Sequence, residues 1–155
     1  MELTSAILCD FAQVREGLLF VSSGGVTRVF HSPAHPFPRP LGLYLALAIE
    51  IGPEEIDRVH EVRVRVTRQS DLSQMGQAGA GFQPVRPPAL QQGEALTIPL
   101  VVPLVMVPIP DFGAYDVHAS PDGLTPRILT VYVLEPPPGF QAPPFSGPPM
   151  AAPPS

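Results

Sequence analysis

The sequence contains no lysine, no asparagine and no tryptophan, and it has one cysteine among its 155 residues. Because Cys9 has no second cysteine to pair with, the chain cannot form an internal disulfide, and nothing in its cysteine content indicates an oxidising compartment. Its basic residues are nine arginines against 14 acidic residues, which gives a formal net charge of −5. A phosphate backbone repels such a chain, so we expect no nucleic-acid partner.

The sequence also lacks long apolar runs, because prolines and charged residues interrupt each run before the roughly 18 residues of a membrane span. The first residues, MELTSAILCDF, carry Glu2 where a secretory signal is positively charged, and Asp10 ends the apolar stretch. We therefore expect a cytoplasmic protein with no membrane partner.

Proline, by contrast, is abundant, with 23 residues. Residues 136–155 read PPPGFQAPPFSGPPMAAPPS, where Phe140, Phe145 and Met150 are the bulky apolar side chains. Such a segment cannot bury enough surface to offset the entropy lost on ordering. We predict one folded domain over residues 1–135 and a disordered proline-rich tail over residues 136–155.

Hydrophobic alternation with a period of two predicts β-strands in most of the domain. In LGLYLALAIEI, leucine and isoleucine take one face while Tyr44, Ala46 and Glu50 take the other. In HEVRVRVTR, valines alternate with Arg63 and Arg65. Further strands are predicted over residues 3–11, 18–23, 26–31, 95–107, 113–120 and 127–134.

Two segments depart from this alternation. GPEEIDR, residues 52–58, suggests one helical turn, because Pro53 suits the first position of a helix. Residues 71–94 are rich in glycine, glutamine and proline, and we predict one short strand near Phe82 between two loops.

Pro99 and Pro103 have the same parity within the predicted strand 95–107. Residues of one parity direct their N–H groups to the same side of a strand, so both prolines remove donors from one edge only. Proline is typical of sheet edges, where it prevents pairing with other chains. We predict an edge strand that ends near Val107.

About eight short strands without crossover helices predict an all-β, antiparallel β-sandwich of about seven to nine strands. GAYDVHASPDG followed by RILTVYVLE predicts a C-terminal hairpin with Pro121, Asp122 and Gly123 at its turn. We interpret this as an immunoglobulin-like fold, although the Cys-Trp-Cys hallmark of antibody domains is absent.

The segment LCDFAQVREGLLFVSSGGVT resembles a catalytic site only superficially. Cys9 lies in an apolar run, where a cysteine is usually an inert small hydrophobic residue. Gly24 and Gly25 are followed by VTRVF, a predicted strand, rather than by the helix that a phosphate-binding loop requires. We predict a buried Cys9 and a glycine turn.

The histidines predict no metal site. Prolines between His31 and His35 forbid the helix that would bring this pair onto one face. Asp116 and His118 share one face of a strand but lack a nucleophile or a third ligand. We therefore predict no catalytic residue, no metal and no cofactor.

Four of the nine arginines, Arg58, Arg63, Arg65 and Arg68, lie within eleven residues. A stripe of this kind is either a solvated strand face interleaved with Glu61 or a surface that binds an acidic partner or a phosphate-bearing ligand.

Several segments together resemble a family of uncharacterised bacterial proteins that is known only as a domain of unknown function. They are LCDFAQVREGLLFVSSGG, LGLYLALAIE, HEVRVRV and GAYDVHASPDG, in that order. The resemblance covers about residues 1–135. It implies a compact β-sandwich and a bacterial source, and it implies no functional residue.

The favoured hypothesis is a non-enzymatic binding or protein-interaction module. Its candidate binding residues are Arg63, Arg65, Tyr44 and Ala46. Tyr44 and Ala46 form an apolar reverse face on the strand 41–51, with no obvious cover except the segment that begins at Asp71. We therefore expect this face to pack in a homodimer or against a protein partner.

Two alternatives remain open. The first is a small-molecule or carbohydrate-binding domain that uses the loop around His31, His35 and Phe37. The second is an enzyme built on Asp10, Asp116 and His118.

Overall fold

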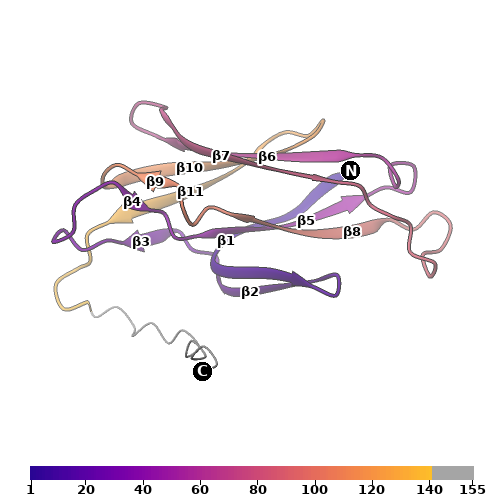
Figure 1. The fold of residues 1–155 in the computed structure, drawn as a ribbon, viewed down its shortest axis with the longest axis horizontal. Coiled ribbons are helices and arrows are strands. Elements are labelled where there is room, and N and C mark those ends of the chain that lie inside the picture. The colour runs from indigo at the N-terminus through magenta and orange to yellow at the C-terminus, as the bar shows by residue number, and fades with distance from the viewer. Residues whose placement is uncertain (141–155) are drawn as a thin grey trace, which may run out of the picture.

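The structure is a computed structural model and describes residues 1–140. Its strands form two main sheets that lie one over the other, visible as two ribbon layers in Figure 1. The prediction of an all-β fold is confirmed. No helix in the described residues is long and apolar enough to cross a membrane.

The first sheet has four strands in the order β2-β1-β5-β8, and all its neighbours are antiparallel. Its members are β1 (Glu2–Arg15), β2 (Leu18–Gly24), β5 (Tyr44–Ile51) and β8 (Leu96–Pro103). The strand predicted over residues 3–11 is therefore longer and ends at Arg15.

The second sheet has five strands in the order β3-β11-β10-β6-β7. Its members are β3 (Arg28–Phe30), β6 (His60–Arg68), β7 (Gln74–Phe82), β10 (Gly113–Pro121) and β11 (Arg127–Leu134). Strand β3 runs parallel to β11, a departure from the predicted antiparallel arrangement. A small separate pair joins β4 (Arg39–Pro40) to β9 (Pro108–Ile109).

The core lies between the two sheets and follows the predicted alternation. Leu45, Leu47 and Ile49 of β5 are buried and face the other sheet, where Val64 and Val117 are buried. This packing explains why the strands with large alternating side chains could be found from the sequence.

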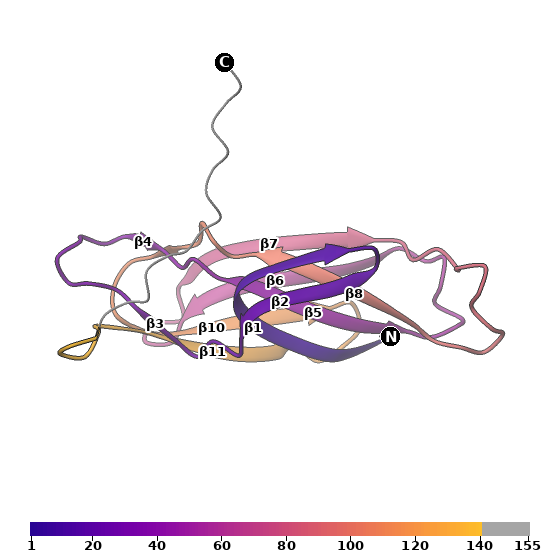
Figure 2. The same cartoon turned by 90° about the horizontal axis from the view of Figure 1, so that it is seen from below.

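The reverse face of β5 is covered within the chain around Ala46, so the expectation that this face lacks an internal cover is wrong. The first half of β1 pairs with β5, and its second half pairs with β2. Figures 1 and 2 show this hairpin lying across the outside of β5 and β8. Ala46 is only 1% exposed and packs with Cys9, Ala12 and Leu19.

Tyr44, which neighbours Ala46 on this face, lies at the margin of the hairpin contact. It is half-buried, and its ring meets that of Phe11 edge to face with centroids 5.6 Å apart. No short sequence pattern indicates this cover, because its central contacts are made by small side chains that lie far apart in the chain.

Strand β7 is a correction to the sequence prediction. The segment predicted as two loops around a short strand contains a strand of nine residues, QMGQAGAGF. Pairing with β6 along its whole length overrides the low strand preference of glycine and glutamine.

The prediction that β8 is an edge strand is confirmed, since β8 pairs with β5 alone. It ends at Pro103 rather than near Val107, because Leu104 to Val107 form a turn in which Val107 N–H donates to Leu104 O at 3.1 Å. Leu104 N–H donates to Leu43 O at 2.9 Å, so even-numbered backbone groups point to β5. Pro99 and Pro103 therefore lie with their missing donors on the open edge.

The connection between β5 and β6 was predicted to contain one helical turn. The predicted helical turn consists of successive turns, in which Glu55 N–H donates to Gly52 O and Arg58 N–H donates to Glu55 O.

Of the proline-rich tail, residues 141–155 lie outside the described residues. Phe140 lies against Phe30, with ring centroids 4.9 Å apart.

Candidate functional site

The outer face of the second sheet carries the arginine stripe. On β6, Val62, Val64 and Val66 point into the core, so Arg63 and Arg65 point to solvent. The structure therefore confirms that these two side chains share an exposed strand face.

Pairing with the neighbouring strands surrounds the stripe with polar groups. Arg65 lies opposite His118 of β10 and Gln77 of β7. Arg63 lies opposite Ser120 of β10 and Gly79 of β7. Because side chains directly opposite in a sheet have Cβ atoms about 5 Å apart, these residues form one continuous surface.

This surface contains a groove of about 560 Å³, which we call the outer groove. It is lined by Glu61, Arg63, Val64, Arg65, Gln74, Gln77, Ala78, Gly79 and Ser120. The glycine at position 79 leaves room there, because it places no side chain beside Arg63.

The two arginines of the outer groove differ electrostatically. Arg63 donates to both carboxylate oxygens of Glu61, from Nε at 3.0 Å and from Nη2 at 2.9 Å. The Arg63 guanidinium lowers the pKa of the Glu61 carboxyl, and Glu61 raises the pKa of Arg63. Within residues 1–140, Arg65 has no ion pair and no hydrogen bond from its side chain. The groove therefore presents one uncompensated guanidinium.

The other two arginines of the stripe lie outside the groove. Arg58 is exposed in the β5–β6 connection. Arg68 forms ion pairs with Asp111 and Asp71, and the first of these raises the pKa of Arg68 most.

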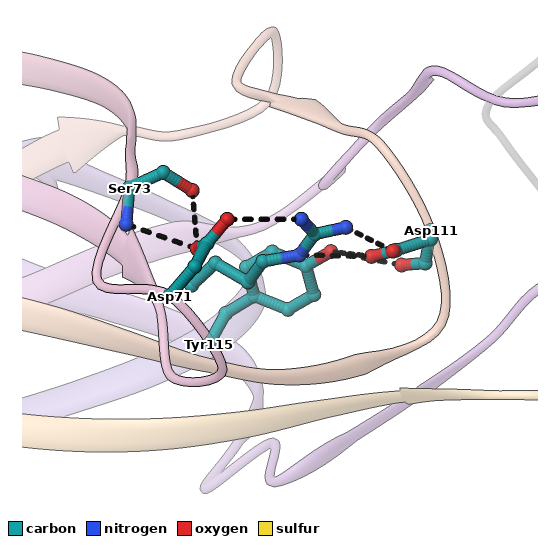
Figure 3. A network of polar contacts seen from close by, with 5 residues as sticks. Asp71, Ser73, Asp111 and Tyr115 are labelled. Atoms are coloured by element: carbon teal, nitrogen blue, oxygen red, sulfur yellow. Dashed lines mark hydrogen bonds and ion pairs between the residues drawn. The ribbon is translucent and has the colours of Figure 1, made fainter.

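Figure 3 shows Asp71, Ser73, Asp111 and Tyr115, which together with Arg68 form a network that fixes one end of the β6–β7 hairpin. Asp71 Oδ1 accepts from the backbone N–H of Ser73 at 3.0 Å and from its hydroxyl at 2.6 Å. The Tyr115 hydroxyl lies within donating distance of Asp111, 2.9 Å from the backbone oxygen and 2.8 Å from Oδ1. The network ties the turn that begins β7 to the chain that enters β10.

Asp10, Asp116 and His118 are not brought together. Asp10 lies on β1 in the first sheet, whereas Asp116 and His118 lie on β10 in the second sheet. Asp116 Oδ1 accepts from Gln69 Nε2 at 2.8 Å and from Thr130 Oγ1 at 2.7 Å. His118 Nε2 pairs with Thr67 Oγ1 at 2.9 Å. Asp116 and His118 therefore each have a structural partner.

Cys9 lies on β1 where the hairpin begins, packs with Ala46 of β5 and is fully buried, as predicted. Its Sγ lies 3.5 Å from Tyr44 O, within reach of a weak hydrogen bond. Burial, with a smaller effect of the nearby Asp10 carboxylate, raises the pKa of the Cys9 thiol. A neutral, enclosed thiol is a poor nucleophile.

In the loop around His31 and His35, the rings of His31 and Phe37 stack with centroids 6.1 Å apart. Phe37 packs edge to face on Phe112, with centroids 4.9 Å apart, and lies against the core. Burial, with help from Arg39, lowers the pKa of His31, whereas His35 is exposed. Among residues 1–140, no three His, Cys, Asp or Glu side chains gather as a metal site would require.

The comparisons with known proteins give one positive result. Residues 4–134 match the model of a family of unknown function, DUF6941. The chain belongs to this family. The match spans every strand that contributes to the outer groove. No curated protein and no solved structure matches the chain.

Sequence reasoning predicted Arg63 and Arg65 but missed Gln74, Gln77 and Ser120. The first two were missed because β7 was interpreted largely as loop. A usable signal was present, since Asp71 and Ser73 supply turn chemistry directly after the valine–arginine strand, which is typical of a hairpin.

Proposed function

We propose that this chain is a non-enzymatic protein-interaction module whose outer groove binds a carboxylate-bearing segment of a partner protein. The observation that carries the proposal is the uncompensated guanidinium of Arg65, placed in a groove among amide and hydroxyl side chains. A guanidinium presents a planar fork of donors that fits a carboxylate in two parallel hydrogen bonds.

The rest of the outer groove supports the same kind of ligand. The side chains of Gln74 and Gln77 lie within hydrogen-bonding distance, with Nε2 of the first 3.3 Å from Oε1 of the second. Both amides and the Ser120 hydroxyl can exchange partners with a bound polar chain. Arg63 already neutralises Glu61, so Glu61 does not cancel the charge of Arg65.

The overall charge of −5 does not prevent this binding. Charges in physiological salt are screened beyond about 8 Å, so the nearest guanidinium dominates the field at the groove. A protein segment fits better than a small molecule, because small-molecule sites are concave, mostly apolar and enclose most of their ligand. The outer groove lies on an exposed sheet face and has a largely polar lining.

A role without catalysis is supported by the placement of the titratable residues. Asp10 is separated from Asp116 and His118 by the sandwich, and both of the latter are held by hydrogen bonds to Thr130 and Thr67.

We further infer that the sandwich is of the immunoglobulin type. The sheet β11-β10-β6-β7 follows the order G-F-C-C′ of variable domains, and β1-β5-β8 follows A-B-E. The Tyr115 hydroxyl reaches the backbone oxygen four residues earlier, as in the tyrosine corner of these folds. Val117 occupies the place of the second cysteine, two residues after that tyrosine.

A fluorescence anisotropy titration with a labelled peptide of alternating glutamate and valine tests the binding role. We expect Arg65→Gln to weaken binding about tenfold, which corresponds to about 1.4 kcal/mol, because one charge-assisted contact is lost. Arg15→Gln is the matched control, since Arg15 is exposed on the opposite sheet. Equal affinity of wild type and Arg65→Gln, or an equal loss in the control, would contradict the proposal.

A further inference from the structure

Strand β7 is an edge strand with an open side. It pairs with β6 alone, and the opposite edge of its sheet is the short strand β3. Beyond the ladder with β6, no backbone hydrogen bond of the described residues involves residues 74–82. Whether β7 can accept a further strand depends on which of its backbone groups face outward.

The hydrogen bonds of β6 show which backbone groups of β7 face outward. Glu61 N–H donates to Asp122 Oδ2 at 2.7 Å, and Glu61 O accepts from Asp122 N–H at 3.0 Å. Asp122 directly follows β10, so the backbone groups of Glu61 point to β10. Backbone direction alternates along a strand, so those of Val62 and Val64 point to β7.

The same alternation then fixes the direction on β7. Val62 lies opposite Ala80, and Val64 lies opposite Ala78, so these two alanines exchange hydrogen bonds with β6. The backbone N–H and C=O groups of Gln77 and Gly79 therefore point to the open side of the sheet. Both residues also line the outer groove, so the open edge and the groove are continuous.

The neighbouring edge of the first sheet is protected, whereas β7 is not. On β8, Pro99 and Pro103 remove donors from the open side. Strand β7 contains no proline and no charged residue over its nine positions. Proline and charge are the common means by which proteins prevent strand addition at an edge. Their absence leaves β7 able to accept another strand.

Charge and shape indicate the partner. A strand added to β7 would lie two strand spacings from β6, about 10 Å away. Gln77 lies directly opposite Arg65, whereas Gly79, the next residue of β7 on this face, adds no side chain, so a glutamate on the added strand can reach Arg65 diagonally past Gly79. The inward positions of the added strand would border Ala78 and Ala80, which are partly buried and suit apolar side chains.

Resting on the function proposed above, we infer that β7 is the docking edge for an extended segment of a partner protein with alternating acidic and apolar residues. The segment adds antiparallel to β7 as a further strand of the sheet. Its main chain bonds to Gln77 and Gly79, and its acidic side chains reach Arg65. Such strand addition takes affinity from the main chain and specificity from alternate side chains.

Two substitutions in the full chain test the edge by anisotropy with the glutamate–valine peptide. Gly79→Pro removes a donor from the open side and keeps the ladder with β6, so we expect binding at least about tenfold weaker. Gly79→Ala keeps the donor, and its Cβ would meet only ordinary contacts, at 3.7 Å from Val62 O and 3.9 Å from Glu61 Oε1. Because Gly79→Ala keeps the donor and adds only one methyl group, we expect it to bind more tightly than Gly79→Pro; equal weakening of the two variants would overturn strand addition.

Peptides methylated on backbone nitrogens provide a second test that leaves the protein unchanged. In an antiparallel pair, residues whose side chains face the groove direct their N–H groups to β7. Methylation at the glutamates should therefore abolish tight binding, and methylation at the valines should not. If both methylated peptides bind as the parent does, strand addition is overturned while the binding role of Arg65 stands.

A second copy of the chain is the rival occupant of the edge. Light scattering over a range of concentrations measures self-association directly. A wild-type dimer that Gly79→Pro converts to monomer, together with no binding of the peptide, would overturn the partner segment in favour of self-pairing. A wild-type monomer that binds the peptide supports the inference.

Discussion

At the scale of single residues, several side chains with a perturbed pKa are buried or hold parts of the fold together. Cys9, Tyr115 and Arg68 have perturbed pKa values, yet each perturbation follows from burial or from partners that hold two chain segments together. Arg65 is different, because its guanidinium has no partner among the described residues. A charge left without a structural role is the better candidate for binding.

The thiol of Cys9 offers a direct test of burial. Because Cys9 is 0% exposed, a thiol reagent should label it only after denaturation. Cys9→Ala should lower the free energy of unfolding by about 1 kcal/mol, through a small cavity, and should leave peptide binding unchanged. Labelling kinetics in native and denaturing buffer measure the first effect, and urea unfolding measures the second. Rapid labelling of native protein would contradict the buried assignment.

The phenol of Tyr115 makes stability depend on alkaline pH. Burial and the hydrogen bond to Asp111 raise its pKa from 10.0 to about 12 in the folded chain. A raised pKa stabilises the fold below pH 10, and this contribution is lost as pH rises through about 12, because only the unfolded chain releases the proton in that interval. We expect the free energy of unfolding to fall by about 2–3 kcal/mol across it.

Tyr115→Phe is the reference for this effect, since it keeps the ring and removes the titrating group. Urea unfolding of both proteins at about pH 8 and about pH 11.5 isolates the contribution of Tyr115 from those of other groups. The variant should show the smaller alkaline loss, and parallel pH curves would contradict the role given to this hydroxyl.

At the scale of elements, the β1–β2 hairpin acts as a partial third layer. Its inner side, with Ala12 and Leu19, packs on Ala46 of β5, and its outer side leaves Phe11, Leu18 and Phe20 exposed. The hairpin therefore replaces the partner chain that the sequence of β5 suggested.

Ala46→Arg tests this cover. The substitution places a charge at a residue that is only 1% exposed and is packed among apolar side chains, so we expect a loss of about 3 kcal/mol or more in the free energy of unfolding. Glu50→Arg on the same strand is the control, because Glu50 is exposed and lies opposite Glu2, where a positive charge is tolerated. A stable Ala46→Arg protein that changes only its oligomeric state would restore the interface hypothesis.

At the scale of the whole molecule, the sequence was informative where large side chains alternate. The valines of β6 and the leucines of β5 show the period of two because they fill the space between the sheets. The two prolines of β8 predicted an edge strand, because both remove an N–H donor from the same side of that strand. These features involve residues that are close together in the chain, so they can be recognised in the sequence.

The other parts of the fold and of the outer groove depend on pairing between strands that are distant in the sequence. Strand β7 consists mainly of glycine, alanine and glutamine, whose small or polar side chains show no clear period, and it becomes a strand by pairing with β6. The outer groove could therefore be predicted only in part, from Arg63 and Arg65. Gln77, Gly79 and Ser120 enter it through the register of three strands, which no short pattern encodes.

Strand β5 has a neighbour on every side. β1 and β8 are bonded to its two edges, the opposite sheet covers one face, and the hairpin covers part of the other face around Ala46. To exchange its amide hydrogens with solvent, β5 must break two ladders and lose two packed faces together. We therefore expect its amides to be exposed only when the sandwich opens as a unit, so that hydrogen exchange in β5 is among the slowest in the molecule.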